Sequence, residues 1–371
     1  MNDDVPRLFR PFQLRGLTIR NRVWLSPMCQ YSVDARDGVP TSWHLVHLGA
    51  RAAGGFGLVM TEATAVKAEG RISPEDTGIW TERQAAAWAG IVDFVHQQGA
   101  AAGIQLAHAG RKASTYKLAL RRPGSVPAGE GGWPTLAPSA VALDGLDAPH
   151  EMTKGQIRET VTAFGAAAGR AAEAGFDVVE LHAAHGYLIH QFLSPLSNGR
   201  GDPYGGSFEN RTRFLAEIVD SVRARWPADK PLFIRFSASE WLDGGWTAED
   251  TATLAERLRD RGVDLVDVSS GGVVAPVNRI PVGPGYQVPF ARQIRLASGM
   301  PTGAVGLISE PEQAEEVLAA ESADAVLLGR AALRDPAWPQ RAAHQLGLTR
   351  DEIPYPAQYL RGAWPATMQT A

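Results

Sequence analysis

The sequence predicts a single α/β domain folded as a (β/α)₈ barrel. Eight short apolar segments alternate with longer stretches of helical character along the 371 residues, which is the order typical of a parallel barrel. The short segments are apolar on both faces, as strands covered by helices are. A doubly wound sheet is the alternative, but its usual glycine-rich nucleotide turn, G-x-G-x-x-G, is absent from the sequence. The predicted strands are residues 23–26, 58–61, 102–106, 178–181, 232–236, 265–268, 302–305 and 325–328.

Capping motifs indicate where the intervening helices begin. Thr81 and Gln84 have the spacing of a capping box, in which each side chain accepts a hydrogen bond from the other residue's backbone. Ser309 and Glu312 repeat that spacing before a second predicted helix. Thr247 precedes acidic residues and suits the N-cap of a third helix. All three starts fall between predicted strands, as the barrel requires.

One long segment breaks the alternation. Residues 114–151 are rich in proline and glycine and show neither a helical nor a strand period. Loops longer than about 12–15 residues are usually functional or disordered. Because this segment follows the third strand, on the face of a barrel that carries active sites, we interpret it as a lid over the site. A passive surface excursion is the alternative interpretation.

The bulk composition excludes several classes of partner. With a net charge of −4, the chain offers no electrostatic basis for binding nucleic acid or an anionic membrane. Its acidic N-terminus lacks the features of a signal peptide, and no apolar run approaches the roughly 20 residues that span a bilayer. Cys29 is the only cysteine, which excludes an intrachain disulfide and an iron–sulfur cluster held by this chain's cysteines. We therefore expect a cytoplasmic protein.

Residues after the last two strands suggest a phosphate site. In a barrel, functional side chains lie at the carboxyl ends of strands, and phosphate is often bound after strands seven and eight. Gly306 and Gly329 would let backbone N–H groups approach an anion closely. Arg330 could bind its oxygens with two hydrogen bonds. Ordinary turn chemistry would explain the glycines equally well.

The fourth strand is followed by two histidines and a tyrosine. His182 and His185 could donate hydrogen bonds to one substrate oxygen. They could also be satisfied by backbone groups or form half of a metal site, although no third ligand with recognised spacing follows. Tyr187 keeps its proton at neutral pH and could act as an acid, but a tyrosine at such a position more often serves packing.

Three further features leave alternatives open. Cys29 has no cationic neighbour in sequence and could be a buried small hydrophobe. Arg235 ends a buried strand and needs a partner, which could be an anionic cofactor ring or a carboxylate of the chain. A barrel lyase using a Schiff base would need a lysine at a strand end. The chain has five lysines, none of which ends a predicted strand: Lys67, Lys112, Lys117, Lys154 and Lys230.

Taken together, the strand-end motifs resemble the Old Yellow Enzyme family of FMN-dependent ene-reductases. The resemblance covers nearly the whole chain, from Leu8 to Trp364, and it recurs at many separate strand ends. Its motifs are Leu25-Ser-Pro-Met28-Cys29, Gln105-Leu-Ala-His108-Ala-Gly-Arg111-Lys112, His182-Ala-Ala-His185-Gly-Tyr187, the polar stretch 198–214, Ala304-Val-Gly306-Leu-Ile and Leu328-Gly329-Arg330.

The resemblance implies a set of FMN contacts. Arg235 would face the N1/O2 side of the ring and stabilise the reduced, anionic flavin, and Cys29 would contact the ring near O4/N5 and tune its potential. Ser26, Pro27, Met28, Ala63 and Gln105 would line the ring, and Gly306, Gly329 and Arg330 would hold the phosphate.

The resemblance also implies the substrate contacts and the reaction. His182 and His185 would bind the oxygen of an α,β-unsaturated carbonyl or nitro compound, Tyr31 would contact it from the other side, and Tyr187 would protonate its α-carbon. NADPH or NADH would reduce FMN, and flavin N5 would pass hydride to the β-carbon. A flavin carrier without turnover is the non-catalytic alternative. Larger relatives with iron–sulfur clusters and further domains are disfavoured by the single cysteine.

Cys29 replaces the threonine of another branch and resembles the bacterial branch often called thermophilic-like. In that branch an arginine near the C-terminus enters the site of the neighbouring subunit. The ending Gln358-Tyr-Leu-Arg361-Gly-Ala-Trp364 is similar, so Arg361 is the candidate, although one residue is inserted before Trp364. The segment 350–371 would then lie at a subunit interface of a homodimer or homotetramer.

Overall fold

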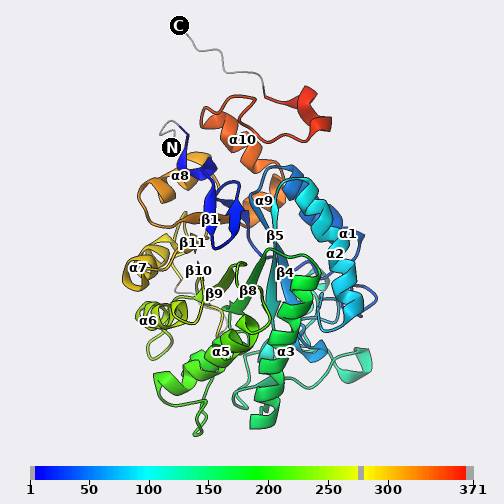
Figure 1. Cartoon of the computed structure of the whole chain (residues 1–371). Coiled ribbons are helices and arrows are strands. Elements are labelled where there is room, and N and C mark those ends of the chain that lie inside the picture. Colours follow the sequence, from blue (N-terminus) through cyan, green and yellow to red (C-terminus); the bar gives the residue numbers. More distant parts are fainter. Residues whose placement is uncertain (1–4, 275–279, 365–371) are drawn as a thin grey trace.

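The fold is a closed barrel of eight parallel strands surrounded by helices (Figure 1). The computed structural model describes residues 5–274 and 280–364. All eight predicted strands are present, so the predicted barrel is confirmed. The barrel strands, in chain order, are β3 (Val23–Leu25), β4 (Leu58–Ala65), β5 (Ala101–Ala107), β8 (Val178–Ala183), β9 (Leu232–Ser237), β10 (Leu265–Ser269), β11 (Thr302–Ala304) and β12 (Ala325–Leu328).

Amphipathic helices cover the outside of the barrel (Figure 1). Most of them turn an apolar stripe inward; in α3, for example, Phe164 and Ala168 are fully buried against the main core. The helices are α1 (Ser42–Ala53), α2 (Glu82–Gln97), α3 (Lys154–Glu173), α4 (Leu188–Leu193), α5 (Phe208–Arg223), α6 (Ala248–Arg259), α7 (Val288–Ser298), α8 (Pro311–Ala319), α9 (Arg330–Arg334) and α10 (Trp338–Gln345). Among the described residues, no helix is both long and apolar enough to cross a membrane.

Two of the three predicted helix starts are confirmed. Thr81 caps α2 and Thr247 caps α6, each with a complete capping box. The box predicted at Ser309 is wrong, because α8 begins at Pro311, its N-cap is Glu310, and no side chain caps it. A proline favours the first helical position and so moves the start of the helix one residue beyond Ser309.

A short hairpin closes the amino-terminal end of the barrel. It consists of β1 (Phe12–Leu14) and β2 (Leu17–Ile19), which pair antiparallel. Its Leu14 and Ile19 pack in one cluster with Trp24, whose ring stacks on Phe233 at a centroid distance of 5.8 Å. Side chains of the described residues thus fill this end of the barrel, and the candidate site residues lie at the carboxyl end.

The insertion 114–151 is ordered against the rest of the molecule. It carries two 3₁₀ turns and the short parallel strands β6 (Leu136–Ala137) and β7 (His150–Glu151). The Arg200 guanidinium ties it down by donating to the Pro138 carbonyl at 2.9 Å. Trp133 donates from its indole to the Glu69 carbonyl at 2.8 Å and packs in one cluster with Cys29. The insertion therefore reaches residues that follow the first barrel strand.

Candidate active site

Strand pairing gathers the predicted ring-binding residues at the carboxyl end of the barrel. A bulge between Met60 and Ala63 carries β4 beyond its predicted end and pairs Ala63 with Gln105. Further around the barrel, His182 pairs with Arg235. From the first strand, Ser26 is buried, whereas residues 27–31 are partly exposed at the mouth. The sequence prediction that these residues share one face of the barrel is confirmed.

The two histidines lie against one another at the end of β8. Nδ1 of His185 is 3.4 Å from Nε2 of His182, and their rings meet edge to face. His182 Nδ1 accepts the Ala184 N–H at 3.3 Å, so its proton is on Nε2. His185 Nε2 lies 2.7 Å from the Ser269 hydroxyl. The described residues contain no group of three or more His, Cys, Asp or Glu side chains arranged to hold a metal ion.

Burial keeps both imidazoles uncharged at neutral pH. It lowers the pKa of His182 and of His185 well below the ordinary value, and the positive charge of Arg235 lowers both further. A neutral imidazole has one N–H donor and one acceptor nitrogen. The pair can therefore polarise an oxygen through hydrogen bonds without itself carrying a charge.

Tyr187 belongs to an aromatic cluster beside the histidines. Its ring centroid is 4.8 Å from that of His182, and it packs in one cluster with Cys29, Tyr31 and Trp133. Burial raises the pKa of the Tyr187 phenol well above its ordinary value, and burial raises the pKa of Tyr31 as well. Burial, with nearby carboxylates, also raises the pKa of the Cys29 thiol. All three groups keep their protons at neutral pH.

Arg235 finds a carboxylate within the chain. Its Nε lies 3.1 Å from Oδ2 of the fully buried Asp267, and its Nη1 donates to the Ser26 hydroxyl at 3.1 Å. Beneath it, Glu180 accepts a 2.7 Å hydrogen bond from the Gln105 amide. Burial raises the pKa of Glu180, and the nearby Asp267 raises it further. The carboxylate alternative for Arg235 is thus confirmed, while the guanidinium still faces the cavity described next.

A cavity of about 220 Å³ runs from Arg235 to the loops after β11 and β12. Its far end is lined by Gly306, Gly329 and Arg330. A Cβ on Gly306, where φ is +129°, would lie 2.9 Å from the Gln287 side chain, so this glycine is required by the close packing. Arg330 is exposed, and no carboxylate pairs with it among the described residues. An unpaired arginine beside close-packed backbone is a suitable site for an anion.

Arg361 is not brought into this site. It lies exposed in the 3₁₀ helix η6 (Ala357–Gly362), beyond α10 in Figure 1. Neighbouring residues of η6 line a depression with Gln98, which precedes β5, and with Arg20, which precedes β3. The arginine is therefore at the amino-terminal end of its own barrel, opposite His182. The last seven residues of the predicted interface segment, 365–371, lie outside the described residues.

Sequence reasoning missed several residues around the site. Lys112, in η3 (Gly110–Lys112), donates to the His185 carbonyl at 2.7 Å and lies 5.0 Å from the Tyr187 ring centroid. It is five residues beyond the end of β5, so a search limited to strand ends excludes it. Ser269 and Trp133 were missed for different reasons, because serine ends many strands and Trp133 lies in a segment without period. For Lys112, the only signal in the sequence is its place at the end of the family motif 105–112, which could have indicated a role near the site.

Comparison with protein families matches residues 7–349 to the NADH:flavin oxidoreductase / NADH oxidase family. The chain belongs to this family. An NADPH dehydrogenase of Geobacillus thermodenitrificans is 51% identical over 356 residues, which cover 96% of this chain and 98% of that protein. The protein is therefore an NAD(P)H-dependent oxidoreductase, with FMN as the cofactor of its family.

Solved structures place this flavin oxidoreductase among the Old Yellow Enzymes. The Old Yellow Enzyme homologue from Zymomonas mobilis is 28% identical with a TM-score of 0.76, and the match covers 97% of this chain and 99% of that one. A 2-naphthoyl-CoA reductase is 25% identical with a TM-score of 0.83 over 91% of this chain, but the match covers only 52% of that larger chain. The barrel of this family thus also occurs within longer proteins.

Proposed function

We propose that this flavin oxidoreductase is an ene-reductase that reduces the activated C=C bond of α,β-unsaturated carbonyl or nitro compounds. The observation that carries the proposal is the pair of neutral imidazoles at 3.4 Å beside a protonated phenol. The three side chains lie at the carboxyl end of the barrel, where His185 and Tyr187 are partly exposed. Donors on one side and an acid on the other are what a polarised alkene needs.

The chain's own residues fit FMN. Arg330, with Gly306 and Gly329, would hold the phosphate at one end of the cavity, and Arg235 would face the N1/O2 side of the ring at the other. The side-chain N–H of Gln105 donates to Glu180. The side-chain oxygen of Gln105 would then be available to the ring. Ser26, Pro27, Met28, Cys29 and Ala63 would line the ring. When bound, FMN supplies hydride transfer between NADPH or NADH and the alkene.

Replacing Arg330 with alanine should weaken FMN binding by roughly tenfold to a hundredfold, which is the usual worth of a charged hydrogen bond. The dissociation constant is measured by titrating the apoprotein with FMN and following quenching of flavin fluorescence. Arg341→Ala is the matched control, because that arginine pairs with Asp335 outside the cavity. Equal FMN affinity in the two variants would remove Arg330 from the phosphate site.

His182 and His185 can both donate to one oxygen. The proton of His182 is on Nε2, as its Nδ1 accepts the Ala184 N–H. His185 can carry its proton on the facing Nδ1 when the Ser269 hydroxyl, 2.7 Å from Nε2, acts as donor. A hydroxyl can donate or accept, so this exchange needs no movement of heavy atoms. Both N–H groups would then stabilise the negative charge that develops on the substrate oxygen.

Tyr187 would deliver the proton to the α-carbon, and Tyr187→Phe should slow enone reduction by about 10²-fold, the lower end of what a positioned general acid contributes. Reduction of FMN by NADPH should change much less. Stopped-flow absorbance separates the two half-reactions. If both slow equally, or neither does, Tyr187 is not the proton donor. Phenylalanine keeps the ring that packs on His182, so packing is controlled within the variant itself.

Other parts of the molecule would shape the substrate side. Tyr31, which follows the first strand, packs in the same cluster as Tyr187, and Trp133 brings the insertion 114–151 onto that cluster, which supports a lid. Arg361 would enter the site of a neighbouring subunit, since it lies at the far end of its own barrel and the tail exposes Tyr359 and Leu360. We therefore propose a homodimer or homotetramer. We also propose a cytoplasmic location, for which the single cysteine is the supporting observation.

The test of this function is product analysis with two matched substrates. Under anaerobic conditions with NADPH, the holoenzyme should convert 2-cyclohexenone to cyclohexanone. It should leave 2-cyclohexenol unchanged, because that alkene has no carbonyl for the histidines to polarise. NADPH oxidation without cyclohexanone, or equal reduction of both alkenes, would contradict the proposal.

A further inference from the structure

The turn that carries His185 is held in an unfavourable backbone conformation. His185 has φ +58° and the next residue, Gly186, has φ +72°, so two successive residues are left-handed. For a residue with a side chain this costs about 1–3 kcal/mol and persists only where surrounding groups enforce it. A Cβ on Gly186 would lie 2.2 Å from the Gly272 carbonyl oxygen, so the turn is also closely covered.

A side chain at the end of β9 and another in η3 hold the backbone of His185. Its N–H donates to the Ser237 hydroxyl at 2.9 Å, and its carbonyl accepts from Lys112 at 2.7 Å. Lys112 also donates to Gly272 at 3.2 Å, and Ser237 donates to Gly271 at 2.7 Å. Both anchors therefore tie the turn to the loop after β10.

Two residues of α4 hold the backbone of Gly186. Its N–H donates to Nδ1 of His190 at 2.9 Å, and its carbonyl accepts from the amide of Gln191 at 2.7 Å. Each backbone group of the two left-handed residues thus has a side-chain partner. Four side chains thus hold one turn of two residues, and that turn lies between His182 and Tyr187 in the chain.

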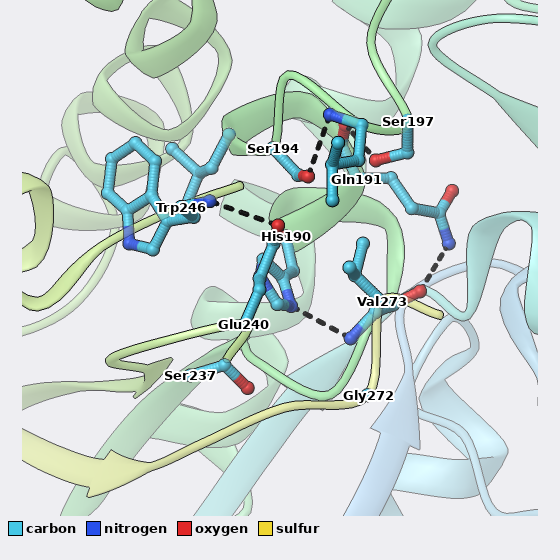
Figure 2. A network of polar contacts seen from close by, with 12 residues as sticks. His190, Gln191, Ser194, Ser197, Ser237, Glu240, Trp246, Gly272 and Val273 are labelled. Atoms are coloured by element: carbon cyan, nitrogen blue, oxygen red, sulfur yellow. Dashed lines mark hydrogen bonds and ion pairs between the residues drawn. The ribbon is translucent and has the colours of Figure 1, made fainter. Parts of the chain in front are cut away.

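A buried carboxylate faces the second ring nitrogen of His190. Since Nδ1 accepts the Gly186 N–H, the imidazole proton must be on Nε2, which lies 3.0 Å from Oε1 of Glu240. The other oxygen of Glu240 accepts the Trp246 N–H at 3.0 Å. Figure 2 shows His190 beside Glu240 and the hydrogen bond that Trp246 donates to Glu240. Both side chains are fully buried, with 0% exposure, so no water can take over either contact.

We propose that His190 and Glu240 are positioning residues for the reaction: Glu240 holds the tautomer of His190 whose Nδ1 fixes Gly186, and thereby places His185 and Tyr187. Neither residue lies among those that would touch FMN or substrate. The inference rests on the proposed function, because the geometry they maintain is that of the oxygen-binding pair and the proton donor. Without the Nδ1 acceptor, the Gly186 N–H loses its partner and the left-handed turn can relax.

The test compares His190→Leu with His190→Asn in the FMN-loaded protein. Asparagine can place its side-chain oxygen where Nδ1 was, whereas leucine cannot accept a hydrogen bond. Both variants lose the contact with Glu240. If His190 had only a structural role, the two variants would therefore show the same fall in melting temperature and the same change in ligand binding. The probe is p-chlorophenol, titrated against the visible flavin spectrum. His190→Leu should raise its dissociation constant by about tenfold, as a lost buried hydrogen bond does, and His190→Asn by much less.

Should His190→Leu fail to fold, His190→Leu/Glu240→Gln removes the unpaired buried charge, while the glutamine side-chain oxygen can still accept the Trp246 N–H. It should weaken p-chlorophenol binding as the single variant is expected to. Wild-type affinity in the leucine variants, or equal weakening in the asparagine and leucine variants, would overturn the inference. Failure of the wild-type holoenzyme to bind the phenol would instead contradict the proposed function, and that result is visible before any variant is made.

Discussion

Replacing His182 with alanine is expected to slow enone reduction by about 10²–10³-fold, the usual effect of removing one donor to a developing oxyanion. His182 is 4% exposed, and its proton is directed from Nε2 toward His185. Without it, the substrate oxygen keeps at most one imidazole donor. The rate is measured by mixing enone with the anaerobically reduced enzyme and following flavin reoxidation.

The control for this variant is His96→Ala, which removes an imidazole on α2 that pairs with Asp177, away from the histidine pair. It should reoxidise at the wild-type rate. FMN content should be unchanged in both variants, because neither histidine lines the cavity between Arg235 and Arg330. Unimpaired reoxidation in His182→Ala would show that the imidazole does not bind the substrate oxygen.

Arg235→Leu is expected to lower the free energy of unfolding by about 3–5 kcal/mol, because it leaves Asp267 without its partner in the interior. The two side chains are 7% and 0% exposed. Burial already raises the pKa of Asp267, and loss of the arginine removes the charge that opposes this rise. The deficit should therefore shrink as the pH falls and Asp267 takes up a proton. Urea unfolding at several pH values measures it.

The double variant Arg235→Leu/Asp267→Leu separates stability from cofactor binding. Replacing both members of a buried pair by apolar groups usually restores stability, so unfolding should return close to wild type. FMN affinity should remain low, because no cation faces the N1/O2 side of the ring. Wild-type FMN affinity in the double variant would show that Arg235 serves the fold alone.

The barrel could be predicted because its strands are apolar on both faces. Such strands are visible in the sequence as short runs of consecutive apolar residues. Strand-end residues followed from the same reasoning, since the carboxyl ends of parallel strands meet at one edge. His182, Arg235 and Gly306 were found in this way and do share the site. The beginning of α8 was misplaced because Pro311 competes with the Ser309 box, and proline fixes the helix start.

The remaining features depend on contacts between distant segments. Lys112 reaches His185 across 73 positions of the chain, and Asp267 meets Arg235 from the neighbouring strand. Neither pairing leaves a periodic trace in the sequence. The buried partnership of His190 with Glu240 is of the same kind, because a histidine inside an apolar helix indicates nothing about the carboxylate that will face it. The role proposed for Arg361 depends on a second chain, which one sequence cannot place.

The most direct measurement is an anaerobic visible spectrum of the purified protein, recorded before and after NADPH and again after 2-cyclohexenone. We predict a flavin band that NADPH bleaches and that the enone restores in proportion to the cyclohexanone formed. A band that bleaches but does not return with the enone would contradict the ene-reductase assignment. The absence of a flavin band after reconstitution with FMN would contradict the cofactor site and every role that depends on it.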